Sequence, residues 1–436
     1  MTTYRPGGQP PQTTPTYDKY QVSASALIAG RSRRRALGLT VLLGVLLALL
    51  AVNAGGQPVT LDLGSGLTHG PDATGPVWVF CGITALICLA AAAFIATAAG
   101  AGRVQRQVSA AVVVALLAFV FGLLAWAARS THVSVGGVLD VTVGGAIAIM
   151  LGSTSGVLSE QSGVFNIAIE GEFLAGAFTA AIVGSATQNT VLGLVAGMAA
   201  GLLTGLLLGV LTIRYQVDQV VAGIIIVTLM TGLTSYLADQ ILTPDANTLN
   251  SPPVIGTVAI PLLDKIPVVG EALFDQSPLF YLAVAVVAAV EFLLRKTRTG
   301  LRIRAAGESP EAAESSGLNV RRLRYLAVSV AGAIAGAGGA YFTVGSSGDF
   351  VQQISSGLGY VALAAVILGS WRPTQAAAAA LLFGFASSIS TTFSLLKVNI
   401  SPSLLLMIPY VVTIVVVCGM NTVGRAPAAA GGRLDG

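Results

Sequence analysis

Charged residues are scarce in this sequence. Asp, Glu, Lys and Arg make up 10% of its 436 residues, whereas a typical soluble domain has about a quarter of its residues charged. So few charges cannot cover a surface that faces water. Apolar runs of about 20 residues recur instead, and each is long enough to cross roughly 30 Å of hydrocarbon. The composition predicts an integral membrane protein and excludes an ordinary soluble domain.

Residues that bind metals or carry out redox chemistry are also rare. The chain has two histidines, His69 and His132, both in short connections, and three cysteines inside apolar segments, Cys81, Cys88 and Cys418. None shows ligand spacing, so we expect no metal site, no cofactor and no enzymatic activity. No lysine stands in a Gly-x-x-x-x-Gly-Lys-Ser/Thr motif. A process driven by ATP would therefore need an ATPase on a separate chain.

The apolar runs predict an all-α polytopic protein with about twelve transmembrane helices. The predicted spans are residues 36–53, 77–99, 108–128, 137–158, 163–185, 190–213, 219–241, 278–294, 325–345, 355–370, 374–395 and 401–420. The span at 355–370 is short, so crossing the bilayer and re-entering from one side both stay open. Glycines in the core also permit broken helices.

The basic residues predict the orientation of these spans. With twelve spans and a cytoplasmic N terminus, all but three of the 23 Lys and Arg residues fall on the cytoplasmic side. The exceptions are Arg129, Lys265 and Lys397. Cytoplasmic loops carry such an excess in membrane proteins. Both termini are therefore predicted in the cytoplasm, and basic residues spread over several loops indicate orientation rather than a nucleic-acid surface.

Composition divides the chain into four predicted regions. Residues 1–30, rich in Pro, Gln, Thr, Gly and Ser, are predicted to form a disordered cytoplasmic tail. Residues 31–134 hold the N-terminal transmembrane helices, and residues 135–422 form the core. Residues 423–436 form a second cytoplasmic tail. The core contains the most charged stretch of the protein, a predicted cytoplasmic loop at 295–324.

This loop contains a short predicted helix. Ser309 is a good N-cap, Pro310 suits the first turn, and Gly317 suits the C-terminal stop. Glu311 complements the positive end of the helix dipole. A helix of two turns is marginal in water by itself, which favours docking of this helix on a partner protein. The alternative is a solvated connector whose charges only set orientation.

Two polar clusters interrupt the apolar spans. Asn166 and Glu170 are four residues apart and are predicted to share one face of the span at 163–185. A charge at such depth costs about 2.5–3.5 kcal/mol on insertion scales, so it usually faces protein or a water-filled path. Either these residues line or gate a path, or they form a polar clamp at a helix break. Asp218 and Gln219 begin the span at 219–241, as path residues or as a solvated cap.

Five motifs in the core carry a family resemblance. They are SGVFNIAIEG at 162–171, DQVVAG at 218–223, TRTGLRIRAAGE at 297–308, GLNVRRLRY at 317–325 and GYVALAAVILG at 359–369. Together they resemble the permeases of branched-chain amino acid, simple-sugar and nucleoside ABC importers. The first two motifs are most similar to the nucleoside branch. Glu311-Ala312-Ala313, followed by Gly317, also matches the EAA-x-x-x-G pattern of importer permeases.

The resemblance implies a permease of a heteromeric importer in a bacterial cell membrane, with no covalent chemistry of its own. Its expected partners are an ABC ATPase subunit, a second related permease, an extracytoplasmic substrate-binding lipoprotein and the lipid bilayer, with no nucleic acid. The ATPase would contact the loop helix. The residues expected there are Glu308, Pro310, Glu311, Ala312, Ala313 and Gly317.

Two other transport functions stay open at the level of sequence. The permease could serve simple sugars such as ribose, because sugars and nucleosides are both neutral and polar. An ion-coupled secondary transporter with twelve spans is the second alternative, with Asn166 and Glu170 supplying the ion site. The loop helix has no role in such a transporter, so the sequence favours the importer.

Overall fold

The computed structural model describes residues 16–54, 56–62, 72–97, 103–128, 132–261, 263, 269–396, 401, 404, 407, 410 and 426–431. The chain forms two compact units. The first comprises Met1–Val59 and Thr74–Ser130, and the second comprises Thr60–Ala73 and Thr131–Gly436.

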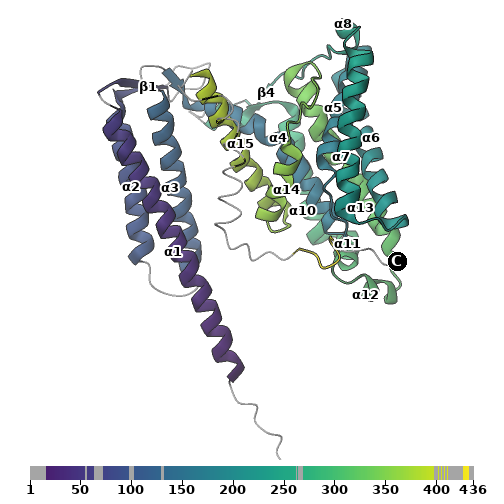
Figure 1. Ribbon diagram of the computed structural model, residues 1–436, viewed down its shortest axis with the longest axis horizontal. Coiled ribbons are helices and arrows are strands. Elements are labelled where there is room, and N and C mark those ends of the chain that lie inside the picture. The colour runs from purple at the N-terminus through teal and green to yellow at the C-terminus, as the bar shows by residue number, and fades with distance from the viewer. Residues whose placement is uncertain are drawn as a thin grey trace, which may run out of the picture. The chain divides into compact units, whose positions relative to one another are not determined.

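In its described part, the first unit has three helices, α1 (Thr16–Asn53), α2 (Val77–Thr97) and α3 (Arg103–Ala127) (Figure 1). Leu43 and Leu47 of α1 pack with Ala85 of α2 and Ala115 of α3 in one apolar core. Cys88 belongs to the same core, and its thiol donates to the Ala115 carbonyl oxygen at 3.2 Å. Cys88 is thus a small core residue whose thiol donor is satisfied within the protein.

Helix α1 starts earlier than the sequence predicts. Residues 16–30, predicted to belong to a disordered tail, are helical and continuous with the apolar part of α1. The Pro-rich composition ends at Pro15, and no further proline occurs before Pro58. Residues that tolerate a helix then lead into the membrane segment, so the helix extends back to the last proline. The predicted tail before residue 16 lies outside the described residues.

The second unit contains the other helices. The long ones are α4 (Val135–Glu160), α5 (Ile169–Thr187), α6 (Thr190–Gly209), α7 (Gln219–Leu237), α10 (Pro278–Lys296), α13 (Val320–Phe342) and α15 (Pro373–Leu395). The short ones are α8 (Ala246–Leu249), α9 (Val269–Phe274), α11 (Arg298–Glu308), α12 (Pro310–Ser315) and α14 (Leu358–Leu368). Single π-helical turns extend α6, α7 and α13, namely η1 (Val210–Arg214), η2 (Ala238–Leu242) and η3 (Thr343–Ser347).

Five short strands occur among the residues that the structure describes, and they connect helices. They are β1 (Pro58–Asp62), β2 (Asp72–Pro76), β3 (His132–Ser134), β4 (Val258–Ala259) and β5 (Asp275–Gln276). Strand β1 pairs in parallel with β3, with Thr60 opposite His132. Strand β4 pairs antiparallel with β5. These strands tie loops together and contribute no layer to the fold.

Glycines let α6 and α13 touch through their backbones. A methyl group on Gly201 of α6 would overlap the carbonyl oxygen of Gly332 on α13, and one on Gly205 would lie 2.7 Å from the Val328 carbonyl oxygen. Gly336 of α13 approaches Gly176 of α5 in the same way. Small residues commonly allow such close packing in membranes. The glycine-rich stretch of α13 is therefore a helix-packing surface that joins α5, α6 and α13.

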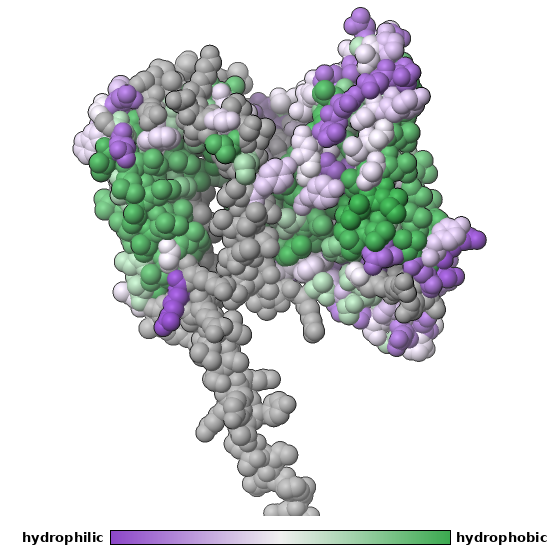
Figure 2. Space-filling view, viewed as in Figure 1, coloured by the Kyte–Doolittle hydropathy of each residue, from purple (hydrophilic) through white to green (hydrophobic). Residues whose placement is uncertain are grey.

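Among the described residues, nine helices are long and apolar enough to cross a membrane, and they coincide with nine of the twelve predicted spans. The predicted span at 108–128 coincides with the later part of α3, which ends at Ala127, and the segment Ala118–Ala127 is a shorter apolar helix. The predicted span at 401–420 lies almost wholly outside the described residues. On the face of the second unit seen in Figure 2, apolar surface occupies the middle, between polar ends. The chain is a multi-pass membrane protein.

Helix α14 occupies the predicted short span at 355–370. It has 11 residues and therefore rises only about 16 Å, roughly half of the hydrocarbon thickness. By itself it cannot cross a bilayer. Its two ends must lie at depths that the surrounding helices determine.

Candidate functional site

A non-helical segment separates α4 from α5. This helix break, residues 161–168, contains Gly163 at a φ of 90°, and the side chain of Ser159 donates to the Val164 carbonyl oxygen at 2.8 Å. The predicted helix over 163–185 is therefore wrong at its start, because α5 begins only at Ile169. The turn at Gly163 ends the helical hydrogen bonding, and side chains take over the freed backbone groups.

Asn166 lies in the helix break, so it does not share a helical face with Glu170 as predicted. Its side-chain nitrogen donates to both carboxylate oxygens of Glu172, at 3.2 and 3.1 Å. Its side-chain oxygen accepts from the Ala168 backbone N–H at 3.0 Å. Asn166 and Glu172 are both fully buried. This pair holds the break in shape, and the sequence pattern alone indicated no role for Glu172.

Glu170, which belongs to α5, caps the N-terminal end of the short helix α14. Its carboxylate accepts from the hydroxyl of Ser355 at 2.7 Å and from the backbone N–H groups of Gly357 and Gly359 at 2.8 and 2.7 Å. These groups lie at the start of α14, where free N–H groups and the helix dipole favour a negative charge. Glu170 is 6% exposed. Its contacts are those of a polar clamp.

The other end of α14 is held from the end of α4. The carboxylate of Glu160 accepts from the indole N–H of Trp371, which follows α14. The side chain of Gln161 donates to the Trp371 carbonyl oxygen at 3.1 Å. The sequence alone did not assign these roles to Glu160 and Gln161, although a carboxylate at the end of an apolar span was a usable signal for Glu160. Residues on both sides of the helix break thus fix both ends of α14.

Asp218 and Gln219 take different roles at the start of α7. The exposed Asp218 side chain accepts from the backbone N–H groups of Val220 and Val221, at 2.9 and 3.1 Å, which is the arrangement of an N-cap. Gln219 is fully buried, and its side chain accepts from the Phe165 backbone N–H in the helix break. Gln219 therefore binds α7 to the helix break.

The helix predicted in the charged loop is present as α12. Pro310 occupies its first turn, and Gly317, at a φ of 80°, follows its end, where the Leu318 N–H bonds to the Ala313 carbonyl oxygen at 3.1 Å. The predicted N-cap Ser309 stands in the right place, but its side chain makes no capping bond. The chain reaches the first turn through Pro310, which lacks one of the N–H groups that a cap would satisfy.

Helix α12 exposes the side predicted to meet a partner. Ala313 is 4% exposed and packs with Ala306 of α11 and Val320 of α13. Glu308, Glu311, Ala312 and Gly317 are exposed, and Pro310 is half-buried. The short helix is thus fixed to two longer helices by one residue, and its surface carries the exposed carboxylates of Glu311 and Glu314.

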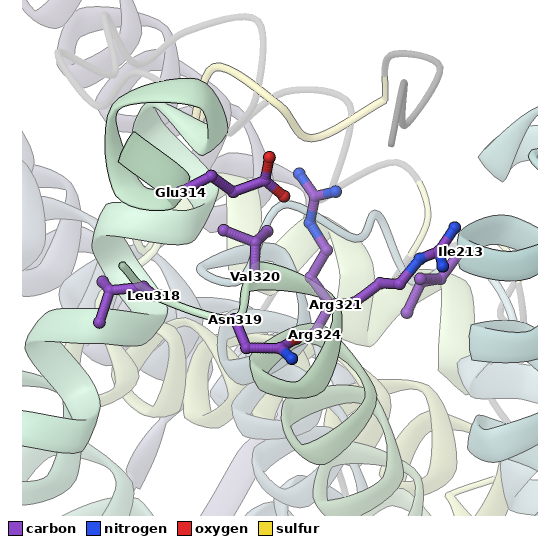
Figure 3. A pocket seen from close by; sticks show the side chains of 7 residues that line it. All are labelled: Ile213, Glu314, Leu318, Asn319, Val320, Arg321 and Arg324. Atoms are coloured by element: carbon purple, nitrogen blue, oxygen red, sulfur yellow. The ribbon is translucent and has the colours of Figure 1, made fainter. Parts of the chain in front are cut away.

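A pocket of about 340 Å³ opens beside α12 (Figure 3). It is lined by Ile213, Glu314, Leu318, Asn319, Val320, Arg321 and Arg324. Arg324 is 4% exposed, and its Nε donates to the Ser162 carbonyl oxygen in the helix break at 3.3 Å. One buried arginine thus connects the wall of this pocket to the helix break. Among the described residues, no three His, Cys, Asp or Glu side chains gather as metal ligands.

Curated transporters are similar to this chain over most of their length. The guanosine ABC transporter permease protein NupQ of Bacillus subtilis is 38% identical over 304 residues, which cover 67% of this chain and 93% of NupQ. The nucleoside ABC transporter permease protein NupC of Lactococcus lactis is 33% identical, over 64% of this chain and 90% of NupC. The putative glucose ABC transporter permease protein TsgC13 of Haloferax volcanii is 32% identical, over 61% and 80%.

No solved structure matches the chain significantly. The family described as "Branched-chain amino acid transport system / permease component" matches residues 138–417. This region begins within α4 and includes the helix break, α12, the pocket beside it and α14. The match covers more than half of the sequence, and the chain therefore belongs to this family of permease components.

Proposed function

We propose that this chain is the transmembrane permease subunit of an ABC importer for nucleosides in a bacterial cell membrane. The observation that carries the proposal is the similarity to two permeases named for guanosine and nucleoside transport, at 38% and 33% identity. The exposed helix α12, with Glu311 and Ala312 at its surface and Gly317 just after its end, supplies the expected contact for an ATPase subunit. Transport would proceed by alternating access.

The end of the second unit that carries α12 faces the cytoplasm in this proposal, together with both chain termini. The excess of Lys and Arg in the corresponding loops supports this orientation. The opposite end, which carries α8, then faces outward and receives the substrate-binding lipoprotein (Figure 1). A second related permease completes the path. Both termini lie inside when the number of crossings is even, and twelve crossings require residues 108–128, 355–370 and 401–420 each to cross, the second of these with residues beyond the 11 of α14.

Movement of the ATPase reaches the membrane core through a short series of contacts. Ala313 fixes α12 to α11 and α13, and Arg324 of α13 donates to the helix break at Ser162. The break in turn supports Glu170, which caps α14. A displacement of α12 is therefore transmitted to α14 without passing through solvent-exposed side chains.

The four polar residues predicted on the substrate path act on it indirectly in this proposal. Asn166, Glu170 and Gln219 are buried, and each forms hydrogen bonds with other groups of the protein. Asp218 caps α7. Their contacts support a role in positioning α14 and α7 beside the path. Neutral polar substrates require hydrogen-bonding groups rather than fixed charges. The Glu170 carboxylate already accepts hydrogen bonds from protein groups, so a substrate of this kind does not need to bind it.

A sugar is the second candidate substrate, because a relative named as a putative glucose permease is 32% identical. Uptake of labelled guanosine, uridine, ribose and glucose by cells that lack this chain separates the two. We expect the deletion to abolish nucleoside uptake and to leave sugar uptake unchanged. Loss of sugar uptake alone would replace the nucleoside assignment, and persistence of all four would refute the importer.

Glu311→Arg tests the contact with the ATPase. The variant reverses a charge on the exposed side of α12, so we expect nucleoside uptake to fall at least tenfold at equal membrane levels. Thr97→Arg is the control, since it adds an arginine at an exposed position of the first unit. Normal transport by Glu311→Arg would reduce α12 to a connector and favour an ion-coupled transporter.

A further inference from the structure

A short segment near the C terminus returns to the end of the second unit that carries α11 and α12. Residues 426–431, which we name the C-terminal strap, lie beside α11 (Figure 1, yellow). Pro427 is buried, whereas its neighbour Ala428 is exposed. The Ala430 N–H bonds to the Pro427 carbonyl oxygen at 3.0 Å, so the strap folds into a turn over residues 427–430.

The strap binds directly to the end of α11. The Ala429 N–H donates to the carbonyl oxygen of Gly307 at 3.0 Å, and Gly307 is buried. A methyl group on Gly307 would overlap the carbonyl oxygen of Gln161, so the end of α11 rests on the helix break without a side chain between them. Pro310, the first residue of α12, follows Gly307 closely in sequence. The strap thus covers the junction of the helix break with the helix pair α11–α12.

Gln219 connects the strap to α7 and to the helix break. Its side-chain oxygen accepts from the Gly431 N–H at 3.1 Å, and its side-chain nitrogen donates to the Ala429 carbonyl oxygen at 3.5 Å. The same nitrogen donates to the Gly163 carbonyl oxygen at 3.3 Å. A Cβ atom on Gly163 would lie 3.0 Å from the Cβ of Ala429. One fully buried amide therefore holds the strap and the break together.

We infer that the C-terminal strap is a coupling device that makes α11, α12, the helix break and α7 move as one body. The inference rests on the proposed function, since it concerns how ATP-driven movement of α12 reaches the core. Small residues suit this role, because Ala429 and Gly431 leave room for backbone groups to meet the Gln219 amide and Gly307. The three hydrogen bonds from the strap to Gly307 and Gln219 hold it in place, and each is weak enough for the strap to detach from them.

Hydrogen exchange of the purified full chain tests the mechanical part without any substrate. The comparison is between the full chain and a chain that ends at residue 425. We expect backbone amides of residues 303–318 to exchange roughly tenfold faster after truncation, because α11 loses its tether. Unchanged exchange in α11 and α12 would refute the inference.

A matched pair of proline variants tests the functional part. Ala429→Pro removes the N–H that binds Gly307 and places proline at the third position of the turn, where it is disfavoured. Ala428→Pro places proline at the second position, which prefers it, and that residue is exposed. At equal membrane levels we expect nucleoside uptake to fall about fivefold or more with Ala429→Pro alone.

The outcomes separate the strap from the proposed function. Equal uptake by Ala428→Pro, Ala429→Pro and the parental chain would refute the strap and leave the importer in place. If the parental chain restores no nucleoside uptake to deletion cells, the substrate assignment fails. Hydrogen exchange then still decides whether the strap tethers α11 and α12.

Discussion

At the scale of single residues, the carboxylates around the helix break serve the protein itself. Glu160, Glu170 and Glu172 are buried, and each accepts hydrogen bonds from protein groups. The sequence singled out the right segment, because a carboxylate inside an apolar span is costly and needs a partner. It paired Asn166 with Glu170, whereas Asn166 binds Glu172. The partners of Glu170 lie at the start of α14 and just before it, 185 or more positions away, and helical spacing carries no information about such contacts.

Replacing Glu170 tests the capping of α14. Glu170→Ala leaves a buried hydroxyl and two N–H groups without their acceptor, so we expect a loss of about 2–4 kcal/mol in unfolding free energy. Glu170→Gln keeps one acceptor oxygen and should lose less. The measurement is thermal unfolding of the purified protein in detergent. Asp349→Ala, at an exposed position, is the control. Equal unfolding of Glu170→Ala and Asp349→Ala would contradict the clamp.

At the scale of elements, apolar run length predicted where most helices lie, and local capping residues predicted α12. Pro310 and Gly317 mark its two ends within the sequence itself. The helix break was not predicted at its observed position, since Asn-Ile-Ala-Ile-Glu is compatible with a helix. Its shape depends on Glu172, six positions from Asn166, and on Gln219, which the fold brings to Phe165 from 54 positions away. The C-terminal strap had no signal, because a run of alanines carries no pattern.

The contact between α6 and α13 gives a prediction at this scale. Gly201→Ala places a methyl group on the Gly332 carbonyl oxygen and must push the helices apart, at a cost of about 1–3 kcal/mol or more. Gly232→Ala is the matched control on α7, where a Cβ atom meets nothing within 4 Å. We expect a lower unfolding temperature for Gly201→Ala only. A parental unfolding temperature for Gly201→Ala would mean that the helices are further apart than described.

At the scale of the whole molecule, the distribution of basic residues gives an orientation that the fold alone does not. Helix α12 and the α8 region lie at opposite ends of the second unit (Figure 1). The sequence predicts that the end carrying α12 is cytoplasmic, because the loop at 295–324 contains many of the Lys and Arg residues.

Single cysteines test this orientation. In a chain without Cys81, Cys88 and Cys418, we expect Asp245→Cys to react with a membrane-impermeant maleimide in intact cells. Ser316→Cys should react only after the membrane is permeabilised. Both residues are exposed, so accessibility within the protein does not separate them. The reverse pattern would invert the topology and move α12 away from any cytoplasmic ATPase.

The backbone contacts among α5, α6 and α13 also restrict which parts of the second unit can deform. Where Gly176, Gly201 and Gly336 meet, there is no layer of side chains that could change rotamers and let one helix slide along another. We therefore expect α5, α6 and α13 to move together as one rigid group. The π-helical turns η1 and η3 stand at the ends of α6 and α13, beyond the glycine contacts. We therefore expect bending in this part of the protein to concentrate at the ends of these three helices, and the larger rearrangements of a transport cycle to occur in the helices around them.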